Sequence, residues 1–99
     1  MQREKLASYL GIAMQAGYAI IGSDKLDGYD KKLYLVLIDS DAGKASRKVF
    51  DRLVHAGVEG YEVESLGSLN GKTNKIIGIK NKGLSEEIKK YLNQKPKMR

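Results

Sequence analysis

The stretch YAIIGSDKLDGYDKKLYLVLID, residues 18–39, contains the two apolar segments that decide the fold of this chain. Residues 33–39, LYLVLID, are apolar and β-branched or aromatic on both alternating faces, which is typical of a strand buried on both sides. Residues 18–21, YAII, predict a second, shorter buried strand. A polar segment beginning Gly22-Ser23-Asp24-Lys25 separates them. Whether this opening is a simple connector or binds a ligand through exposed backbone amides decides the function.

Helical and strand patterns alternate on both sides of this stretch. Apolar residues at helical spacing predict the longer helices, and short apolar runs predict the strands. The predicted order is helix 3–16, strand 18–21, short helix from 23, strand 33–39, helix 45–54, strand 60–64, short helix 65–71, strand 75–80 and helix 84–92. Because alternating strands and helices need crossover connections, we predict an α/β fold. It is a three-layer α/β/α sandwich with a central mixed sheet of about four strands.

Small polar residues and glycines mark the expected helix ends. Ser23 is placed to cap the short second helix, which the turn pair at 27–28 then ends. Ser40 or Asp41 is placed to cap the third helix. Gly17 suits the left-handed conformation just past the end of the first helix.

Length and composition limit the class of protein. The 99 residues predict one domain, residues 1–93, followed by a basic tail, residues 94–99, that we expect to be flexible. The absence of cysteine excludes disulfides and thiol chemistry. The polar N-terminal segment does not resemble a signal peptide, and no apolar run approaches the length of a membrane span. We therefore expect a soluble, cytoplasmic monomer with no membrane partner.

The positive charge is distributed unevenly along the chain. The formal net charge is +6, yet residues 1–71 carry nine Lys and Arg against ten Asp and Glu. Residues 72–99 carry nine basic and two acidic residues and so hold the whole excess. Such a local cationic field attracts polyanions such as nucleic acids. A solubilising tail together with a lysine-rich helix face is the alternative interpretation.

Motifs for catalysis or metal binding are incomplete in this sequence. The segment GSLNGKT, residues 67–73, has three residues where a phosphate-binding loop needs four, and it leads into a strand. The segment DSDAG, residues 39–43, begins like a calcium loop, but Phe50 occupies the position of the bidentate Glu. His55 is the only histidine. We therefore expect no enzyme activity, no catalytic residue, no metal and no cofactor.

Aromatic residues offer one further candidate for nucleic-acid binding. The spacing of most of the six tyrosines fits the core or its edge. Tyr29 lies beside Gly28 and the basic pair Lys31-Lys32. It is the tyrosine whose position also suits an exposed surface on which a base stacks.

Three segments carry a resemblance through their order and spacing. LASYLGIAMQAGYAIIGSDKL, residues 6–26, has a leucine-rich helix, an Ala-Gly end, a short strand and a Gly-Ser turn. LVLIDSDAG, residues 35–43, is a central strand followed by an Asp-Ala corner. SLGSLNGKTNKIIGIKNKGL, residues 65–84, has Leu-Gly, Gly-Lys, an apolar strand and a Gly-Leu helix entry. Together they resemble the L-seven-Ae ribosomal protein family, especially its short bacterial ribosomal-protein-like members, over residues 4–92.

The resemblance implies the same sandwich and a site for structured RNA, either a kink-turn or ribosomal RNA. A kink-turn is a sharply bent internal loop with tandem sheared G·A pairs. Two surfaces would bind it: the start of the second helix, where free N–H groups suit phosphate, and the loop before the last strand. The residues that the resemblance places in or beside these surfaces are Gly22, Ser23, Asp24, Lys25, Gly28, Lys31, Lys32, Gly71, Lys72, Thr73, Asn74 and Lys75.

The chain departs from the family at the positions that read RNA. The family pattern is Gly-Thr-Asn-Glu with a Lys three residues later, whereas here Asp24, Lys25 and Gly28 replace Asn, Glu and Lys. Asp accepts but does not donate hydrogen bonds, and Lys25 cannot accept from a guanine. Lys25, Lys31 and Lys32 would supply charge without reading bases. The alternative is a protein-interaction module on the same scaffold, associated with ribosome or transcription machinery, in which kink-turn specificity has been lost.

Overall fold

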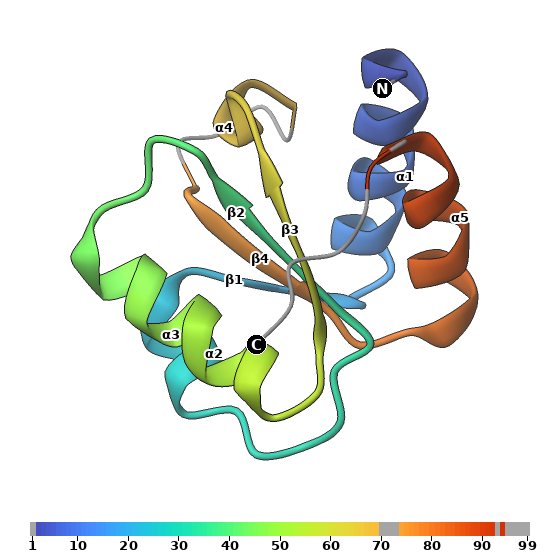
Figure 1. Cartoon of the computed structure of the whole chain (residues 1–99). Coiled ribbons are helices and arrows are strands. Elements are labelled where there is room, and N and C mark those ends of the chain that lie inside the picture. The colour runs from blue at the N-terminus through green and yellow to red at the C-terminus, as the bar shows by residue number, and fades with distance from the viewer. Residues whose placement is uncertain (1, 70–73, 93, 95–99) are drawn as a thin grey trace.

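The computed structural model of the chain describes residues 2–69, 74–92 and 94. These residues form five helices and four strands in the predicted order (Figure 1). The elements are α1 Arg3–Gln15, β1 Ala19–Ile21, α2 Ser23–Asp27, β2 Leu35–Asp39, α3 Lys44–His55, β3 Glu59–Val63, α4 Leu66–Leu69, β4 Ile76–Ile79 and α5 Lys82–Leu92.

The four strands form one mixed sheet in the order β1-β4-β2-β3. Strand β4 pairs antiparallel with both β1 and β2, whereas β2 and β3 are parallel. Every residue of β2 is buried, so the central strand is covered on both faces as its composition predicts. The predicted α/β class, with a mixed sheet of four strands, is confirmed.

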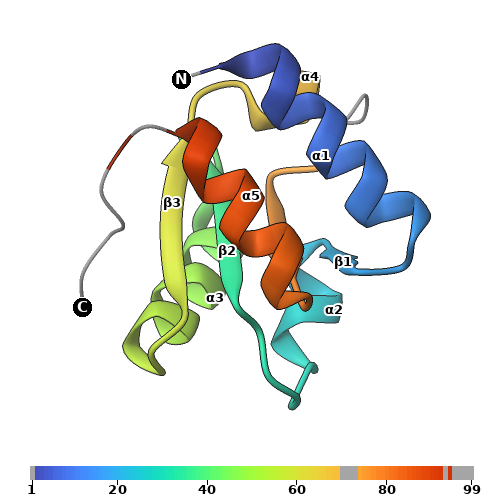
Figure 2. The same ribbon diagram turned by 90° about the vertical axis from the view of Figure 1, so that its right-hand side faces the viewer.

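The two faces of the sheet carry separate apolar clusters. On one face, Leu37 and Ile77 pack with α1, α4 and α5. On the other face, Val36 and Ile38 pack with α3 and with Leu26 of α2. Figures 1 and 2 show α1 and α5 on one side of the sheet and α2 and α3 on the other. The alternation of side chains along each strand therefore divides the core into two halves.

Two glycines, one on each side of Val36, allow α2 and α3 to lie close to the sheet. Val36 of β2 pairs in register with Gly60 on one side and with Gly78 on the other. A Cβ atom on Gly60 would lie 2.6 Å from Val54 of α3, and one on Gly78 would lie 2.6 Å from Leu26 of α2. The two glycines therefore set how closely these helices approach the strands.

The expected helix caps are partly wrong. Gly17 has φ 77°, as expected for a residue just past a helix end. Helix α2, however, has Gly22 at its N-cap position, and Ser23 is its first residue and caps nothing. Neither Ser40 nor Asp41 caps α3, which begins after Gly43 without a side-chain cap.

None of the helices among the described residues is both long enough and apolar enough to cross a membrane. The first residue assigned by sequence to the tail, Gln94, donates from Nε2 to the carbonyl oxygen of Glu62 in β3. Residues 95–99, the remainder of that predicted tail, lie outside the described residues.

Candidate nucleic-acid interface

The two surfaces implied by sequence meet at one edge of the sheet. Strands β1, β2 and β3 end at this edge and β4 begins there, and we call it the carboxyl edge. The amide of Gly22 donates to the carbonyl of Ile76 at 3.1 Å, and the amide of Asp39 donates to the carbonyl of Lys75 at 2.8 Å. The start of β4 therefore lies between the β1–α2 turn and the end of β2.

The β1–α2 turn leaves backbone donors free. Gly22 has φ 98°, a conformation that glycine adopts without strain. The amides of Ser23, Asp24 and Lys25 have no acceptor among the described residues, and no side chain caps this helix start. Because α2 has only five residues, its dipole is weak, and these three amides are the main feature of the turn.

The second surface is described only at its end. Gly71, Lys72 and Thr73 lie outside the described residues, whereas Asn74 and Lys75 are both partly buried. The Nζ atom of Lys75 lies 3.6 Å from Oδ2 of Asp39 and 3.8 Å from Oδ2 of Asp41. Two carboxylates of the protein therefore neutralise the charge of Lys75, so it attracts a phosphate less than an unpaired lysine would.

Asp39 is the most buried charged group of the carboxyl edge, with 2% of its surface exposed. Its Oδ1 accepts from the amide of Asp41 at 2.9 Å and its Oδ2 from the amide of Gly67 at 3.4 Å. Burial alone would raise the pKa of Asp39, but these two amides and the Lys75 ammonium together lower it below its usual value. The ionised carboxylate thus joins β2, α4 and the start of β4.

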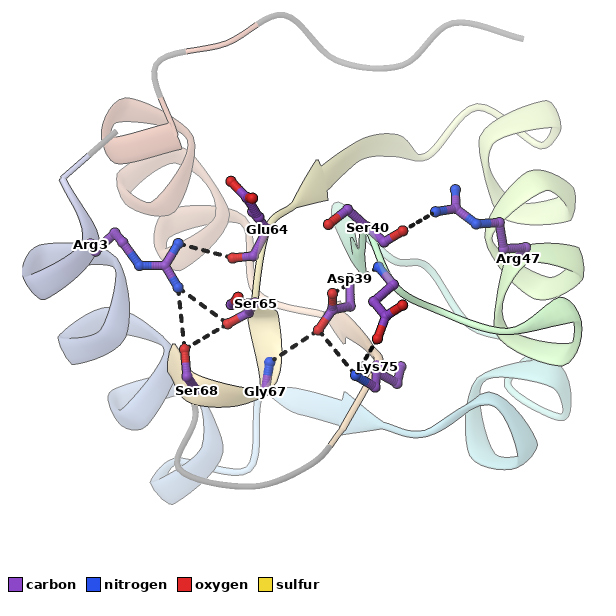
Figure 3. A network of polar contacts seen from close by, with 10 residues as sticks. Arg3, Asp39, Ser40, Arg47, Glu64, Ser65, Gly67, Ser68 and Lys75 are labelled. Atoms are coloured by element: carbon purple, nitrogen blue, oxygen red, sulfur yellow. Dashed lines mark hydrogen bonds and ion pairs between the residues drawn. The ribbon is translucent and has the colours of Figure 1, made fainter.

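Further polar contacts close the same edge (Figure 3). Arg3 of α1 donates to the carbonyls of Glu64 and Ser65, and Ser68 also donates to the carbonyl of Ser65. Arg47 of α3 donates to the carbonyl of Ser40 at 2.8 Å. Because these side-chain donors bind acceptors of the protein itself, most polar groups of the carboxyl edge stabilise the fold and are not available to a ligand.

The lysines of the α2–β2 loop lie at the other end of the sheet. Lys31 and Lys32 precede β2, whose first residue pairs with Ile79 at the far end of β4. Nζ of Lys32 lies 5.3 Å above the ring of Tyr34. Gly28 follows α2 with φ −89°, so its backbone does not require glycine. The structure therefore brings the β1–α2 turn to Lys75 but does not bring Lys31 and Lys32 there.

Helix α3 contributes cations that the sequence reasoning missed. Lys44, Lys48 and Arg52 recur every fourth residue, so they share one face of the helix. Lys48 and Arg52 line a hollow of about 310 Å³ whose other wall includes Ser23 and Asp24 of α2. The spacing was visible in the sequence, but averaging the charge over residues 1–71 concealed it.

Within residues 2–69, 74–92 and 94, no group of three or more His, Cys, Asp or Glu is placed so that it could hold a metal ion. What the site offers is a combination of the amides at Ser23–Lys25, which have no acceptor within the described ranges, and cations of α3. This arrangement suits a phosphate or a polar edge of a base.

Comparison with known proteins gives a fold match. No protein-family model and no curated protein matches the chain. Among solved structures, a protein with unknown function from Bacillus halodurans C is similar, with 26% sequence identity and a TM-score of 0.73. The alignment covers 91% of this chain and 98% of that one. The chain is therefore similar to a solved protein along almost its whole length.

Proposed function

We propose that this chain is a non-enzymatic RNA-binding protein of the cytoplasm that contacts structured RNA through the β1–α2 turn and the loop before β4. The observation that carries the proposal is the adjacency of the β1–α2 turn to the start of β4, directly after the described end of that loop, Asn74 and Lys75. The hydrogen bond from Gly22 to Ile76 holds them together, beside three backbone amides without an acceptor among the described residues. An RNA phosphate is a natural acceptor for such donors.

The charge around the turn favours an anionic partner. Lys25 of α2 and Lys44 and Lys48 of α3 are exposed and have no ion pair within the described residues. Unpaired cations release counterions when they meet phosphates, which contributes to affinity in a salt-dependent way. Lys75, held by Asp39 and Asp41, serves mainly to position the loop.

The kink-turn is the RNA class that the family resemblance suggests, and we propose membership of the L-seven-Ae family on the same ground. Asp24 and Lys48 line the same hollow, so the lysine reduces the repulsion that the carboxylate exerts on a phosphate there. Gly28 offers no side chain to a phosphate. We therefore expect binding to bent RNA that depends more on shape and backbone than on base identity.

The test is a titration of the protein with a kink-turn hairpin and with a plain duplex of equal length, at two salt concentrations. We expect the kink-turn to bind more tightly at both concentrations and both affinities to fall with salt. Equal affinity for the two RNAs would mean that the protein binds RNA through charge alone and does not recognise the kink. No binding to either near physiological salt would overturn the proposal.

A pair of double variants separates the loop before β4 from the tail. Lys72→Glu with Lys75→Glu should weaken binding much more than Lys95→Glu with Lys97→Glu, which makes the same change in charge. Equal losses would assign the contact to the tail. Because Lys75 also neutralises Asp39, thermal melting of both variants accompanies the titration.

A second candidate is the protein-interaction module, with ribosome-associated or transcription-associated proteins as partners. The observation in its favour is two exposed large apolar side chains, Ile12 in the last turn of α1 and Tyr18 just after that helix, which are 48% and 39% exposed. Exposed apolar surface is typical of protein interfaces when it is contiguous. A pull-down that survives ribonuclease and is abolished by Ile12→Lys would favour this candidate over RNA binding.

A further inference from the structure

Two hollows border α3 and share Arg52 as a lining residue, one beside α2 and the other beside the α2–β2 loop. The first hollow, described above, has a volume of about 310 Å³ and is lined by Ser23, Asp24 and Lys48 among others. The second hollow, of about 430 Å³, is bordered by residues 29–33 of the α2–β2 loop and by the last turn of α3. Arg52 lines both. We call the two hollows together the α2–α3 seam.

The seam links lysines that the sheet keeps apart. Along α3 it runs from Ala45 to Ala56, a length of about 16 Å at the rise of an α-helix. Its beginning adjoins the β1–α2 turn and its end adjoins Lys31 and Lys32. The loop lysines that lie far from Lys75 thus line a hollow that meets the hollow beside the turn at Arg52.

Arg52 holds α2 and α3 together in the middle of the seam. Its Nη2 donates to the carbonyls of Leu26 and Asp27 at 3.4 Å each and pairs with Oδ1 of Asp27 at 3.4 Å. These contacts join the end of α2 to α3 and use Arg52 within the protein. Asp27 is partly neutralised in the same way. The groove is therefore held by its own residues and does not depend on a ligand for its shape.

Once Arg52 is paired with Asp27, three lysines and two carboxylates remain along the seam: Lys31, Lys32 and Lys48 against Asp24 and Asp30. Lys31 and Lys48 have neither a hydrogen bond nor an ion pair to other described residues. The second hollow brings Lys31, Lys32 and Arg52 around a single carboxylate, Asp30. Over both hollows the basic residues outnumber the acidic ones by one, and the unpaired lysines lie where an anion can reach them.

The floor of the second hollow is apolar and aromatic. Leu33 and Leu53 are buried beneath it, and Tyr29 is partly buried and packs against the same cluster. The volume falls in the range of small-molecule pockets, about 300–1,000 Å³. Cationic walls combined with an aromatic side chain characterise sites that bind single-stranded nucleic acids, where phosphates follow lysines and bases stack on rings.

We propose that the α2–α3 seam binds a single-stranded segment of RNA that continues from the structured part, with phosphates at Lys48 and Lys31 and one base in the second hollow against Tyr29. This inference rests on the proposed function but adds a second contact surface and a second class of RNA. It explains why Lys31 and Lys32 lie away from the carboxyl edge, since they serve the far end of the seam.

The experiment compares a kink-turn hairpin with and without a single-stranded extension of about six adenosines at either end. For the wild-type protein, at least one extension should raise affinity threefold or more. Lys31→Glu with Lys48→Glu should reduce that ratio to about one and lower the salt slope for the extended RNA by about 1.4, the value for two single-strand phosphate contacts. An extension that adds nothing to wild-type binding would overturn the inference while leaving the proposed function intact.

The matched control is Lys5→Glu with Lys82→Glu. Both lysines are exposed and belong to α1 and α5, on the opposite face of the sheet. This variant carries the same change in net charge, so it should keep the wild-type ratio between extended and plain hairpins. Equal ratios in the two double variants would mean that the seam makes no contact.

The base contact is tested at Tyr29, whose packing against the core requires two substitutions. Tyr29→Phe keeps the ring and should keep the ratio, whereas Tyr29→Leu keeps apolar volume but loses the stacking surface and should remove most of the gain in affinity that the extension gives. A thermal melt within a few degrees of wild type certifies each variant as folded. If the Tyr29→Leu variant keeps the wild-type affinity for the extended RNA, no base stacks on Tyr29 in the second hollow, and this part of the inference is overturned.

An oligoadenosine alone separates the two proposals. If the hairpin does not bind but the single strand binds and is lost in Lys31→Glu with Lys48→Glu, the proposed function at structured RNA fails and the seam stands. If neither RNA binds the wild-type protein, both proposals fail.

Discussion

The carboxyl edge and the α2–α3 seam contain similar side chains but use them in opposite ways. At the carboxyl edge, Lys75 faces Asp39 and Asp41, and the donors of Arg3 go to backbone carbonyls. Along the seam, Lys31 and Lys48 have no partner among the described residues. Paired charges mainly hold the fold, whereas unpaired charges remain available to a ligand. A count of lysines therefore says less about binding than the contacts each lysine makes.

The largest expected effect belongs to the carboxyl edge. Asp39→Ala should lower the free energy of unfolding by about 2–4 kcal/mol, because it leaves the amides of Asp41 and Gly67 and the Lys75 ammonium without their acceptor. Urea unfolding followed by circular dichroism measures the change. Asp41→Ala is the matched control, since that side chain is 91% exposed and should change stability by less than about 0.5 kcal/mol. Similar losses in both variants would contradict the structural role of Asp39.

The next effect concerns the support beneath the seam. Gly78→Ala places a methyl group 2.6 Å from Leu26, the one buried residue of α2, and should cost about 1–3 kcal/mol of unfolding free energy. Gly28→Ala is the control, because its new Cβ would meet nothing closer than 3.9 Å. If α2 shifts as expected, the Gly78→Ala protein also loses part of the gain from the RNA extension. Equal stability of the two variants would show that Gly78 does not set the position of α2.

Acid should weaken the carboxyl edge selectively. The pKa of Asp39 is lower in the folded protein than its usual value, so the unfolded chain binds the proton more readily and stability falls as the pH falls. The contribution is complete above the ordinary carboxyl pKa, about 4, and is lost through the folded value below it. The stability difference between wild type and Asp39→Asn, about 1–2 kcal/mol at neutral pH, should therefore shrink on acidification. A difference that stays constant down to about pH 2 would contradict this assignment.

A smaller effect is expected at the middle of the seam. Arg52→Gln removes the ion pair with Asp27 and the contacts with two carbonyls of α2, but this side chain is half exposed. The cost should be about 0.5–1 kcal/mol, measured by thermal or urea unfolding. Lys44→Gln, which changes an exposed lysine of the same helix, should cost less. A loss of several kcal/mol of unfolding free energy would mean that the contacts of Arg52 stabilise the fold as strongly as those of Asp39 at the carboxyl edge.

The smallest stability effect belongs to the lysines proposed to bind RNA. Lys31→Ala with Lys48→Ala should change the free energy of unfolding by no more than about 0.5 kcal/mol, since neither lysine has a described partner. Lys75→Ala should cost more, because it leaves buried Asp39 without its cation. If the double variant proves the less stable protein, the contrast between the two regions is wrong.

Local patterns predicted the elements well but their ends less well. The strand expected at 33–39 begins at Leu35, and the caps expected from Ser23 and Asp41 do not form. The reason is where the helices begin: Ser23 is already the first residue of α2, and α3 begins only after Gly43, two residues beyond Asp41. Asp39, in turn, accepts from the amides of Asp41 and Gly67 by hydrogen bonds that no local pattern indicates. The expected RNA-binding residues divide in space, with the β1–α2 turn and Lys75 at one end of the sheet and Lys31 and Lys32 at the other.

The sequence by itself determined the class of fold and the order of the elements, because the spacing of apolar residues selects helix or strand within a few residues. The tertiary structure alone decided which charged side chains pair with other groups of the protein and which have no partner among the described residues. It also decided that Gly60 and Gly78 flank Val36 and so bring α3 and α2 down onto one face of the sheet. Pairing of strands and charges depends on contacts between residues distant in the chain, and the energy of a buried charge depends on every group around it.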